Sequence, residues 1–261
     1  MITGQTALIT GASSGMGKAC AERLAAMGVN LVLAARRKER LEEMVGKLDK
    51  VKVRVAQLDV KDYTQVEALE KELDKEGVDV DILINCAGLA LGTNLLQQGH
   101  ISDWETTIDT NIKGLLYMTR IFLPGMLKRD RGHIVNIGSV AGHECYRGGS
   151  VYAATKHAVR ALSQSTRLDT VGSKLRVSEI DPGCVHTEFS EVRWKDKEKA
   201  EKFYQGFEPL VAEDIADAVV YCLTRPPHVN ISEMIIYPQA QPCLNEIHRA
   251  GQVLPKSFGS R

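Results

Sequence analysis

A tyrosine and a lysine four residues apart are the first pair in this sequence that could do acid–base chemistry. Tyr152 and Lys156 fall in a segment of helical composition, where residues four apart share one face. A free tyrosine titrates at about pH 10, and a neighbouring ammonium group favours the phenolate. We therefore predict that Lys156, together with the positive charge of a bound cofactor, lowers the pKa of Tyr152. Tyr152 could then give a proton to a carbonyl oxygen or take one from an alcohol.

Ser139 and Asn111 could complete a catalytic group around this pair. Ser139 follows a short apolar run, and a hydroxyl at the end of a strand can bond a substrate oxygen beside Tyr152. Asn111 lies in a long predicted helix, where asparagine is unfavourable, so it indicates a local distortion or a water-binding role near Lys156. Taken singly, each residue has a structural alternative as a turn serine, a packing amide or a solvated lysine.

A glycine-rich turn follows the first apolar run and precedes a helical segment. Its glycines would allow a tight turn, close backbone approach to a pyrophosphate and close helix packing. The spacing GxxxGxG differs from the common GxGxxG, and a turn without a ligand is the alternative. The position between strand and helix favours dinucleotide binding. The expected contacts are Gly11, Ser13, Ser14, Gly15, Met16 and Gly17.

Two adjacent arginines indicate which dinucleotide binds. An NAD site commonly places an acid about 20 residues after the glycine turn, to bond the ribose 2′-hydroxyl. This chain has Arg36 and Arg37 there, and no acid before Glu39. A guanidinium binds a 2′-phosphate that a carboxylate would repel. We predict NADP as the cofactor, with both arginines at its 2′-phosphate; a solvated arginine at a helix start is the alternative for each.

Further cofactor contacts are expected where later strands end. Asp59 and Val60 follow the third predicted strand and should lie near the adenine. Asn85, Ala87 and Gly88 follow the fourth and should lie along the riboses. Taken alone these signals are weak, since Asp59 could equally cap the next helix.

Strands and helices alternate along the chain and must position these residues. The predicted strands are 6–10, 31–35, 51–58, 82–85, 133–137, 176–180 and 234–236, and the predicted helices are 18–27, 38–48, 64–75, 102–128, 152–171 and 214–223. Such alternation implies parallel strands, right-handed crossovers and helices on both faces of the sheet. We predict an α/β fold, a single doubly wound Rossmann domain over residues 1–261 with a central parallel sheet of about seven strands. The long connection 186–210 is predicted as a substrate-loop insertion, with a helix over 191–202.

Charge and composition exclude other classes of protein. The chain carries 33 basic and 33 acidic residues, so no global positive field would gather nucleic acid or an anionic membrane. The apolar runs are too short to span a bilayer, and the first residues show no signal-peptide pattern. Six scattered cysteines without a CxxC pair favour reduced thiols over disulfides or a zinc site. We expect a cytoplasmic protein with no metal.

Together these motifs resemble the classical short-chain dehydrogenase/reductase family. They fall in family order and spacing over residues 6 to about 190, as Thr10-Gly-x3-Gly-x-Gly17, Asn85-x-Ala87-Gly88, Asn111, Ser139, Tyr152-x3-Lys156 and Pro182-Gly183. Cys86 departs from the pattern, since many members have asparagine there.

The resemblance implies hydride transfer with a role for each motif residue. Tyr152 would be the acid–base group, Ser139 would orient the carbonyl, and Lys156 would hold the nicotinamide ribose. Asn111 would hold a water of a proton relay. The resemblance also implies a homotetramer built on helices 102–128 and 152–171. Tyr152 and Lys156 would themselves contact the cofactor, and so would Pro182, Gly183, Val185 and Thr187.

Several stretches are similar to a subgroup that acts on small 3-hydroxy acids: 85–92, 103–111, 187–193 and 228–231. This subgroup includes NADP-dependent serine, L-allo-threonine and 3-hydroxypropionate dehydrogenases and sulfoacetaldehyde reductases. The implied function is an NADP-dependent oxidoreductase that transfers hydride between the nicotinamide and the 3-hydroxyl or carbonyl of a small hydroxy acid. The alternatives are an NADPH-dependent reductase of bulkier ketones or steroids, and a dinucleotide-binding sensor without turnover.

An anionic substrate would need a cationic partner, and two arginines are placed to supply one. Arg147 lies five residues before Tyr152, and Arg193 follows the sixth strand. We hypothesise that one of them binds a carboxylate or sulfonate bidentately, although both could be solvated surface residues. Tyr146, in the loop before Tyr152, is expected to line the same pocket.

Overall fold

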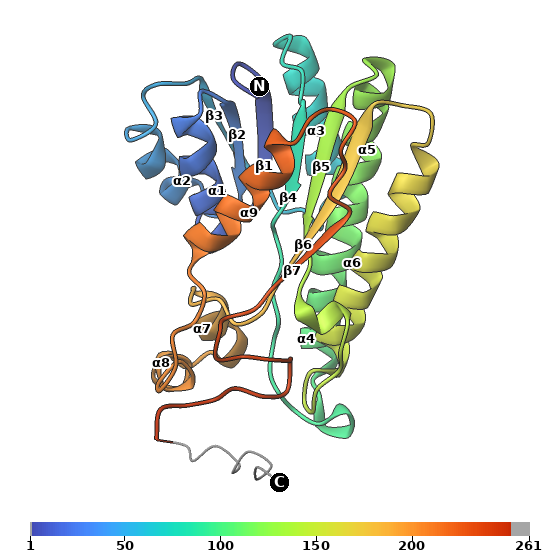
Figure 1. The fold of residues 1–261 in the computed structure, drawn as a ribbon. Helices are drawn as coiled ribbons and strands as arrows, with labels where there is room; N and C mark the ends of the chain where they lie inside the picture. The colour runs from blue at the N-terminus through green and yellow to red at the C-terminus, as the bar shows by residue number, and fades with distance from the viewer. Residues whose placement is uncertain (1, 252–261) are drawn as a thin grey trace, which may run out of the picture.

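The sheet predicted from the sequence is present in the computed structural model, which describes residues 2–251. Its strands run parallel in the order β3-β2-β1-β4-β5-β6-β7 (Figure 1). The bounds are β1 (Thr6–Thr10), β2 (Asn30–Ala35), β3 (Val53–Gln57), β4 (Ile82–Asn85), β5 (Gly132–Ile137), β6 (Leu175–Pro182) and β7 (Glu233–Ile236). The strand order reverses at the β1/β4 pair, which makes the carboxyl ends beside that pair the expected ligand site.

Helices cover both faces of the sheet (Figure 1). On one face α1 (Gly15–Ala26), α2 (Lys38–Val45) and α9 (Ala212–Thr224) contribute to a shared apolar cluster. On the other face a second cluster includes residues of α3 (Tyr63–Lys75) and α5 (Leu115–Lys128), and α6 (Ser150–Asp169) packs on β6. The predicted doubly wound α/β architecture is therefore confirmed. Within residues 2–251, no helix combines the length and the apolar character that a bilayer crossing requires.

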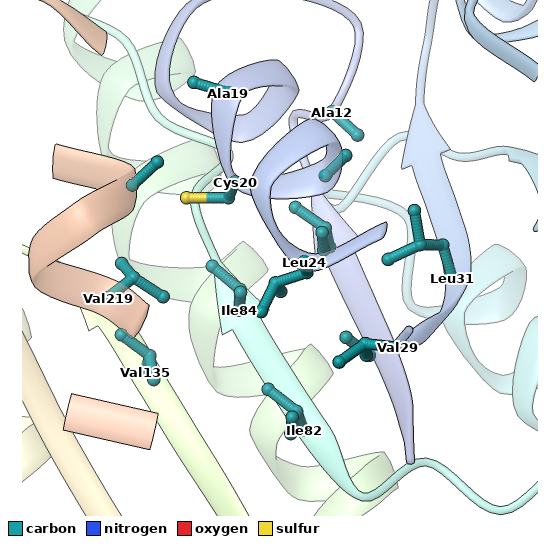
Figure 2. Close-up of a cluster of buried hydrophobic side chains, with 14 of the residues drawn as sticks. Ala12, Ala19, Cys20, Leu24, Val29, Leu31, Ile82, Ile84, Val135 and Val219 are labelled. Atoms are coloured by element: carbon teal, nitrogen blue, oxygen red, sulfur yellow. The ribbon is translucent and has the colours of Figure 1, made fainter. Parts of the chain in front are cut away.

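The helix that follows the glycine turn is fixed by the first apolar cluster. Figure 2 shows Cys20 and Leu24 of α1 beside Ile84 of β4, with Val135 of β5 and Val219 of α9 nearby, and all five are buried. Burying one such aliphatic side chain contributes about 1.5–3 kcal/mol. The N-terminus of α1 is thus held rigidly at the carboxyl edge of the sheet.

The long helix predicted over 102–128 is confirmed: α4 (Ile101–Ile108), a wider π-helical turn at Asp109–Gly114 and α5 follow one another without a break. A second predicted helix is wrong in its continuity. The single helix expected over 191–202 is two short ones, α7 (Phe189–Trp194) and α8 (Lys197–Phe203). Lys195 between them adopts φ +52°, a left-handed conformation that ends α7.

Candidate active site

A cleft runs along the carboxyl ends of β1 to β4, where the sequence places the cofactor. Most of the predicted contacts line it, and the segment after β6 closes its other side. The lining residues are Gly11, Ser13, Ser14, Gly15, Met16, Gly17, Ala34, Ala35, Arg36, Arg37, Leu58, Asp59, Val60, Cys86, Ala87, Gly88, Leu89, Thr110, Thr187, Glu188, Phe189 and Val192.

The glycine turn leaves no room for side chains at two of its positions. A Cβ on Gly17 would stand 2.5 Å from the Gly11 carbonyl oxygen, so α1 could not pack as closely against the turn. Gly11 adopts φ +68°, and a Cβ there would stand 3.0 Å from the Ala87 Cα. The first N–H groups of α1 therefore face the cleft at a place where glycines leave the backbone without side chains. This arrangement fits the pyrophosphate of a dinucleotide.

The two arginines after β2 both line the cleft, in different environments. Arg37 donates from Nη1 to Glu188 Oε2 at 2.9 Å and from Nη2 to Ser14 Oγ at 2.9 Å. Arg40 contacts the other oxygen of Glu188. Arg36 is exposed at the rim of the cleft. Sequence reasoning missed Glu188, because it lies 151 positions from Arg37 and only the fold brings it there.

Three of the predicted catalytic side chains meet beyond the end of β5. Ser139 lies two residues after the end of β5, and its hydroxyl lowers the pKa of the neighbouring Tyr152 phenol. Lys156 is buried one helical turn further along α6, and its Nζ lies 5.8 Å from the Tyr152 ring centroid. The ammonium donates to the Ile137 carbonyl oxygen at 2.8 Å. A hydroxyl, a phenol and a buried ammonium thus adjoin one end of the cleft.

The lowering of the Tyr152 pKa by Lys156 together with a bound nicotinamide stays a prediction, and the protein's own groups act in the opposite direction. Burial dominates and raises the pKa of Tyr152, while the Ser139 hydrogen bond and the charge of Arg193 oppose that rise. Burial also lowers the pKa of Lys156 itself. Tyr152 is therefore held as a phenol, the form that can donate a proton.

The distortion predicted around Asn111 is confirmed. Asn111 lies in the π-helical turn, and its amide is engaged on both sides. Its Oδ1 accepts from Leu89 N–H at 2.9 Å, and its Nδ2 donates to the Leu89 carbonyl at 2.8 Å and to Thr155 Oγ1 at 3.0 Å. The side chain thereby clamps the strand connection that carries Gly88 against α6.

Comparison with known proteins agrees with this geometry. Residues 5–198 match the model of a family described as short chain dehydrogenase. The chain belongs to the short-chain dehydrogenase family. It is 43% identical to an NADP-dependent 3-hydroxy acid dehydrogenase of Schizosaccharomyces pombe, over 95% of this chain and 98% of that protein. It is 42% identical to sulfoacetaldehyde reductase 2 of Chromohalobacter salexigens, over 90% of this chain and 94% of that protein.

A solved structure of the same family has closely the same fold. It is the closed form of a serine dehydrogenase complexed with NADP+, which superposes with a TM-score of 0.88. The sequence identity is 46%, and the match covers 94% of this chain and all of the other. The family predicted from the sequence motifs is therefore confirmed.

Beside Tyr152 of this short-chain dehydrogenase lies an arginine from α7. Arg193 donates from Nη2 to Tyr146 Oη at 2.8 Å, and its guanidinium carbon lies 5.9 Å from the Tyr152 ring centroid. Its Nε is buried and has no hydrogen-bond partner among the described residues. Arg147 is exposed, and no contact joins it to this group within residues 2–251. Of the two arginines suggested by the sequence, the fold brings only Arg193 to the site.

Six predicted cofactor residues lie outside the cleft lining: Tyr152 and Lys156, described above, and Asn85, Pro182, Gly183 and Val185. Asn85 faces α5, where its Nδ2 donates to Asn136 Oδ1 at 2.9 Å and contacts Thr119. Pro182 ends β6, and Val185 is buried against the first apolar cluster. A Cβ on Gly183 would stand 2.5 Å from Gln241 Oε1, in the segment after β7. Their contacts with a cofactor remain predictions.

Proposed function

We propose that this protein is an NADP(H)-dependent oxidoreductase that interconverts the 3-hydroxyl and carbonyl groups of a small anionic hydroxy acid. The observation that carries the proposal is one arrangement of side chains. Tyr152, with Ser139 and Lys156 beside it, packs on Phe189 of the cleft lining, and its ring centroid lies 5.9 Å from the guanidinium carbon of Arg193. The chain's relatives include an NADP-dependent 3-hydroxy acid dehydrogenase and a sulfoacetaldehyde reductase, which act on substrates of this chemistry.

The coenzyme half of the proposal depends on how the cleft fits NADP. The bare turn at Gly11 and Gly17 and the start of α1 would hold the pyrophosphate. Arg36 and Arg37 would bind the 2′-phosphate, together with the Ser14 hydroxyl that Arg37 already contacts. The bound nicotinamide supplies or accepts the hydride.

The protein's own residues would handle the proton. In reduction, Tyr152 would donate its phenolic proton to the carbonyl oxygen as the alcohol forms, with Ser139 holding the same oxygen. Lys156 would hold the nicotinamide ribose from its buried position on α6. The Asn111 amide is already engaged with Leu89 and Thr155, so the relay role that the resemblance implies would need an atom of Asn111 outside that amide.

Arg193 would select the anionic substrate. Its Nε is buried and has no partner among residues 2–251, so a carboxylate or sulfonate beside Tyr152 could accept a hydrogen bond there without displacing an acceptor from this part of the chain. A bidentate pair with the guanidinium would set the distance from the acid group to the reacting carbon. Tyr146 would fix the guanidinium orientation through its hydroxyl.

A substrate panel tests the proposal. Serine, L-allo-threonine, 3-hydroxypropionate, isethionate and a hydrophobic ketone–alcohol pair are each assayed with NADP(H) and with NAD(H). We expect turnover with at least one small anionic substrate, and a clear preference for NADP(H). Turnover confined to the hydrophobic pair, or a preference for NADH, would refute the proposal.

We also propose that the protein acts in the cytoplasm as a homotetramer and folds as a single domain. Support for assembly comes from large apolar side chains that remain exposed on α4, α5 and α6: Ile101, Ile108, Leu116 and Leu168. Light scattering of the purified protein tests the tetramer. A monomer at micromolar concentration would contradict it.

A further inference from the structure

Two acidic residues are buried behind the catalytic serine, and the mechanism above does not use them. Glu179 and Asp181 alternate with Ile180 along β6 and therefore point to the same face of the sheet, towards α6. Their exposed fractions are 1% and 0%. Acidic side chains are almost never buried this fully unless they are paired.

Asp181 is bonded to the segment that carries Ser139. Its Oδ1 accepts the Ser139 backbone N–H at 2.8 Å, and its Oδ2 lies 3.0 Å from Nε2 of His143. One carboxyl group thus holds the chain on both sides of the short turn at Val140–Gly142. The Ser139 hydroxyl accepts from Ala141 N–H at 3.1 Å within this turn. The position of the serine relative to Tyr152 therefore depends on Asp181.

Gly138 makes room for both carboxyl groups. A Cβ on Gly138 would stand 1.9 Å from Asp181 Oδ1 and 2.6 Å from Glu179 Oε1, so the two oxygens crowd one point beside the backbone. Two carboxylates this close in a buried site cannot both be ionised, because the second charge would be repelled and desolvated. The pair must hold a proton near neutral pH. Burial raises the pKa of Glu179 to about 8 and that of Asp181 to about 7.

The contacts decide which carboxyl group holds that proton. Asp181 accepts a backbone hydrogen bond, which favours its ionised form. Glu179 Oε1 is buried and has no hydrogen-bond partner among the described residues. The positive charge of Lys156 lowers the pKa of Asp181 and so favours its ionised form. The nearby Arg160 is instead bonded through Nε to Glu233, at 2.7 Å. The groups around the pair are Asn136 of β5, His143 of the following turn, Lys156, Arg160 and Ser163 of α6, and Glu233 of β7.

We propose that Asp181 is a positioning residue that fixes Ser139 and balances the charge of Lys156, and that Glu179 makes this possible by keeping the proton of the buried pair. Asp181 is the carboxylate that most strongly opposes the loss of the Lys156 proton. One buried charge thereby holds two members of the catalytic group. This inference depends on the roles proposed above for Ser139 and Lys156.

The pH dependence of turnover tests the proposal. As pH rises through about 8, the pair loses its proton, and the second charge should disturb Ser139. We expect kcat for reduction by the wild-type enzyme to fall about tenfold between about pH 7 and about pH 9, because the protonated fraction of the pair falls by that factor. Glu179→Gln has no proton to lose, so its ratio of kcat at the two pH values should stay within about twofold. Equal ratios for the two proteins would overturn the proposal.

Asp181→Asn tests the positioning role against a matched control. The amide can still accept from Ser139 N–H but has no charge for Lys156, so we expect kcat to fall at least about tenfold with little change in the KM for NADPH. Ser178→Ala is the control, because Ser178 is buried on the opposite face of β6 and bonded to His133. A loss of kcat in Asp181→Asn no larger than that in Ser178→Ala would also overturn the proposal.

Two readouts require no turnover and so separate this inference from the proposed function. The wild-type protein should show the infrared band of a buried protonated carboxyl group at neutral pH, and Glu179→Gln should lack it. Because the folded protein keeps a proton that the unfolded chain releases, its stability should fall as pH rises from the ordinary glutamate value towards about 8. This fall should be smaller in Glu179→Gln. Without that band, or with the same fall in both proteins, Glu179 does not hold the proton.

Discussion

Replacing Arg193 with methionine should separate anionic from neutral substrates. Methionine keeps an unbranched side chain against Tyr146 and removes the charge, the bond to Tyr146 Oη and the buried Nε. A hydrogen bond between charged groups contributes about 1.5–3 kcal/mol, so kcat/KM for a carboxylate or sulfonate substrate should fall about 10- to 150-fold. A neutral ketone loses no charged partner, and its kcat/KM should change less than about threefold.

The assay follows NADPH oxidation with a semialdehyde acid and with a neutral ketone of similar size. Arg147→Met is the matched control. Arg147 lies five residues before Tyr152 in the sequence, but it is exposed and makes no contact with Tyr152 among the described residues. Its kinetics should equal those of the wild type. Equal losses on the anionic and neutral substrates in Arg193→Met, or an equal loss in Arg147→Met, would refute the assignment.

Three further changes test other parts of the site. Tyr152→Phe should lower kcat by about 10²-fold or more while NADPH binding, followed by fluorescence titration, stays unchanged; normal turnover would exclude the phenol as the acid. Arg37→Met should raise the KM for NADPH about 10- to 100-fold and leave that for NADH nearly constant, and parallel changes would place the 2′-phosphate elsewhere. Gly138→Ala should cost about 1–3 kcal/mol in denaturant unfolding, because its Cβ would collide with Asp181; unchanged stability would mean that the carboxyl pair shifts freely.

Much of the fold followed from local sequence. The apolar strands, the glycine turn and the alternation of segments are local signals, and they predicted the parallel sheet and the position of the cleft at its carboxyl edge. The relation of Tyr152 to Lys156 was also predictable, because residues four apart on a helix must share a face.

The rest depended on contacts between distant segments. Glu188 reaches Arg37 only because the connection after β6 folds over the cleft, and no spacing in the sequence records that. The pKa of Tyr152 depends on its burial, which composition does not reveal. The break between α7 and α8 also escaped prediction, because a run of charged helix formers conceals a left-handed residue at Lys195.

The short helix α7 links Arg37 to Arg193, the two arginines proposed above to bind anions. Glu188, at its N-terminal end, is bonded to Arg37, and Arg193, in its last turn, stands beside Tyr152. If the two arginines bind their anions as proposed, the choice of coenzyme and the choice of substrate both depend on the position of α7. Replacing Arg37 so that the site accepts NAD would remove its bond to Glu188. Without that bond, α7 and therefore Arg193 would be less firmly positioned. Coenzyme preference in this protein should therefore be difficult to redesign without retuning substrate recognition as well.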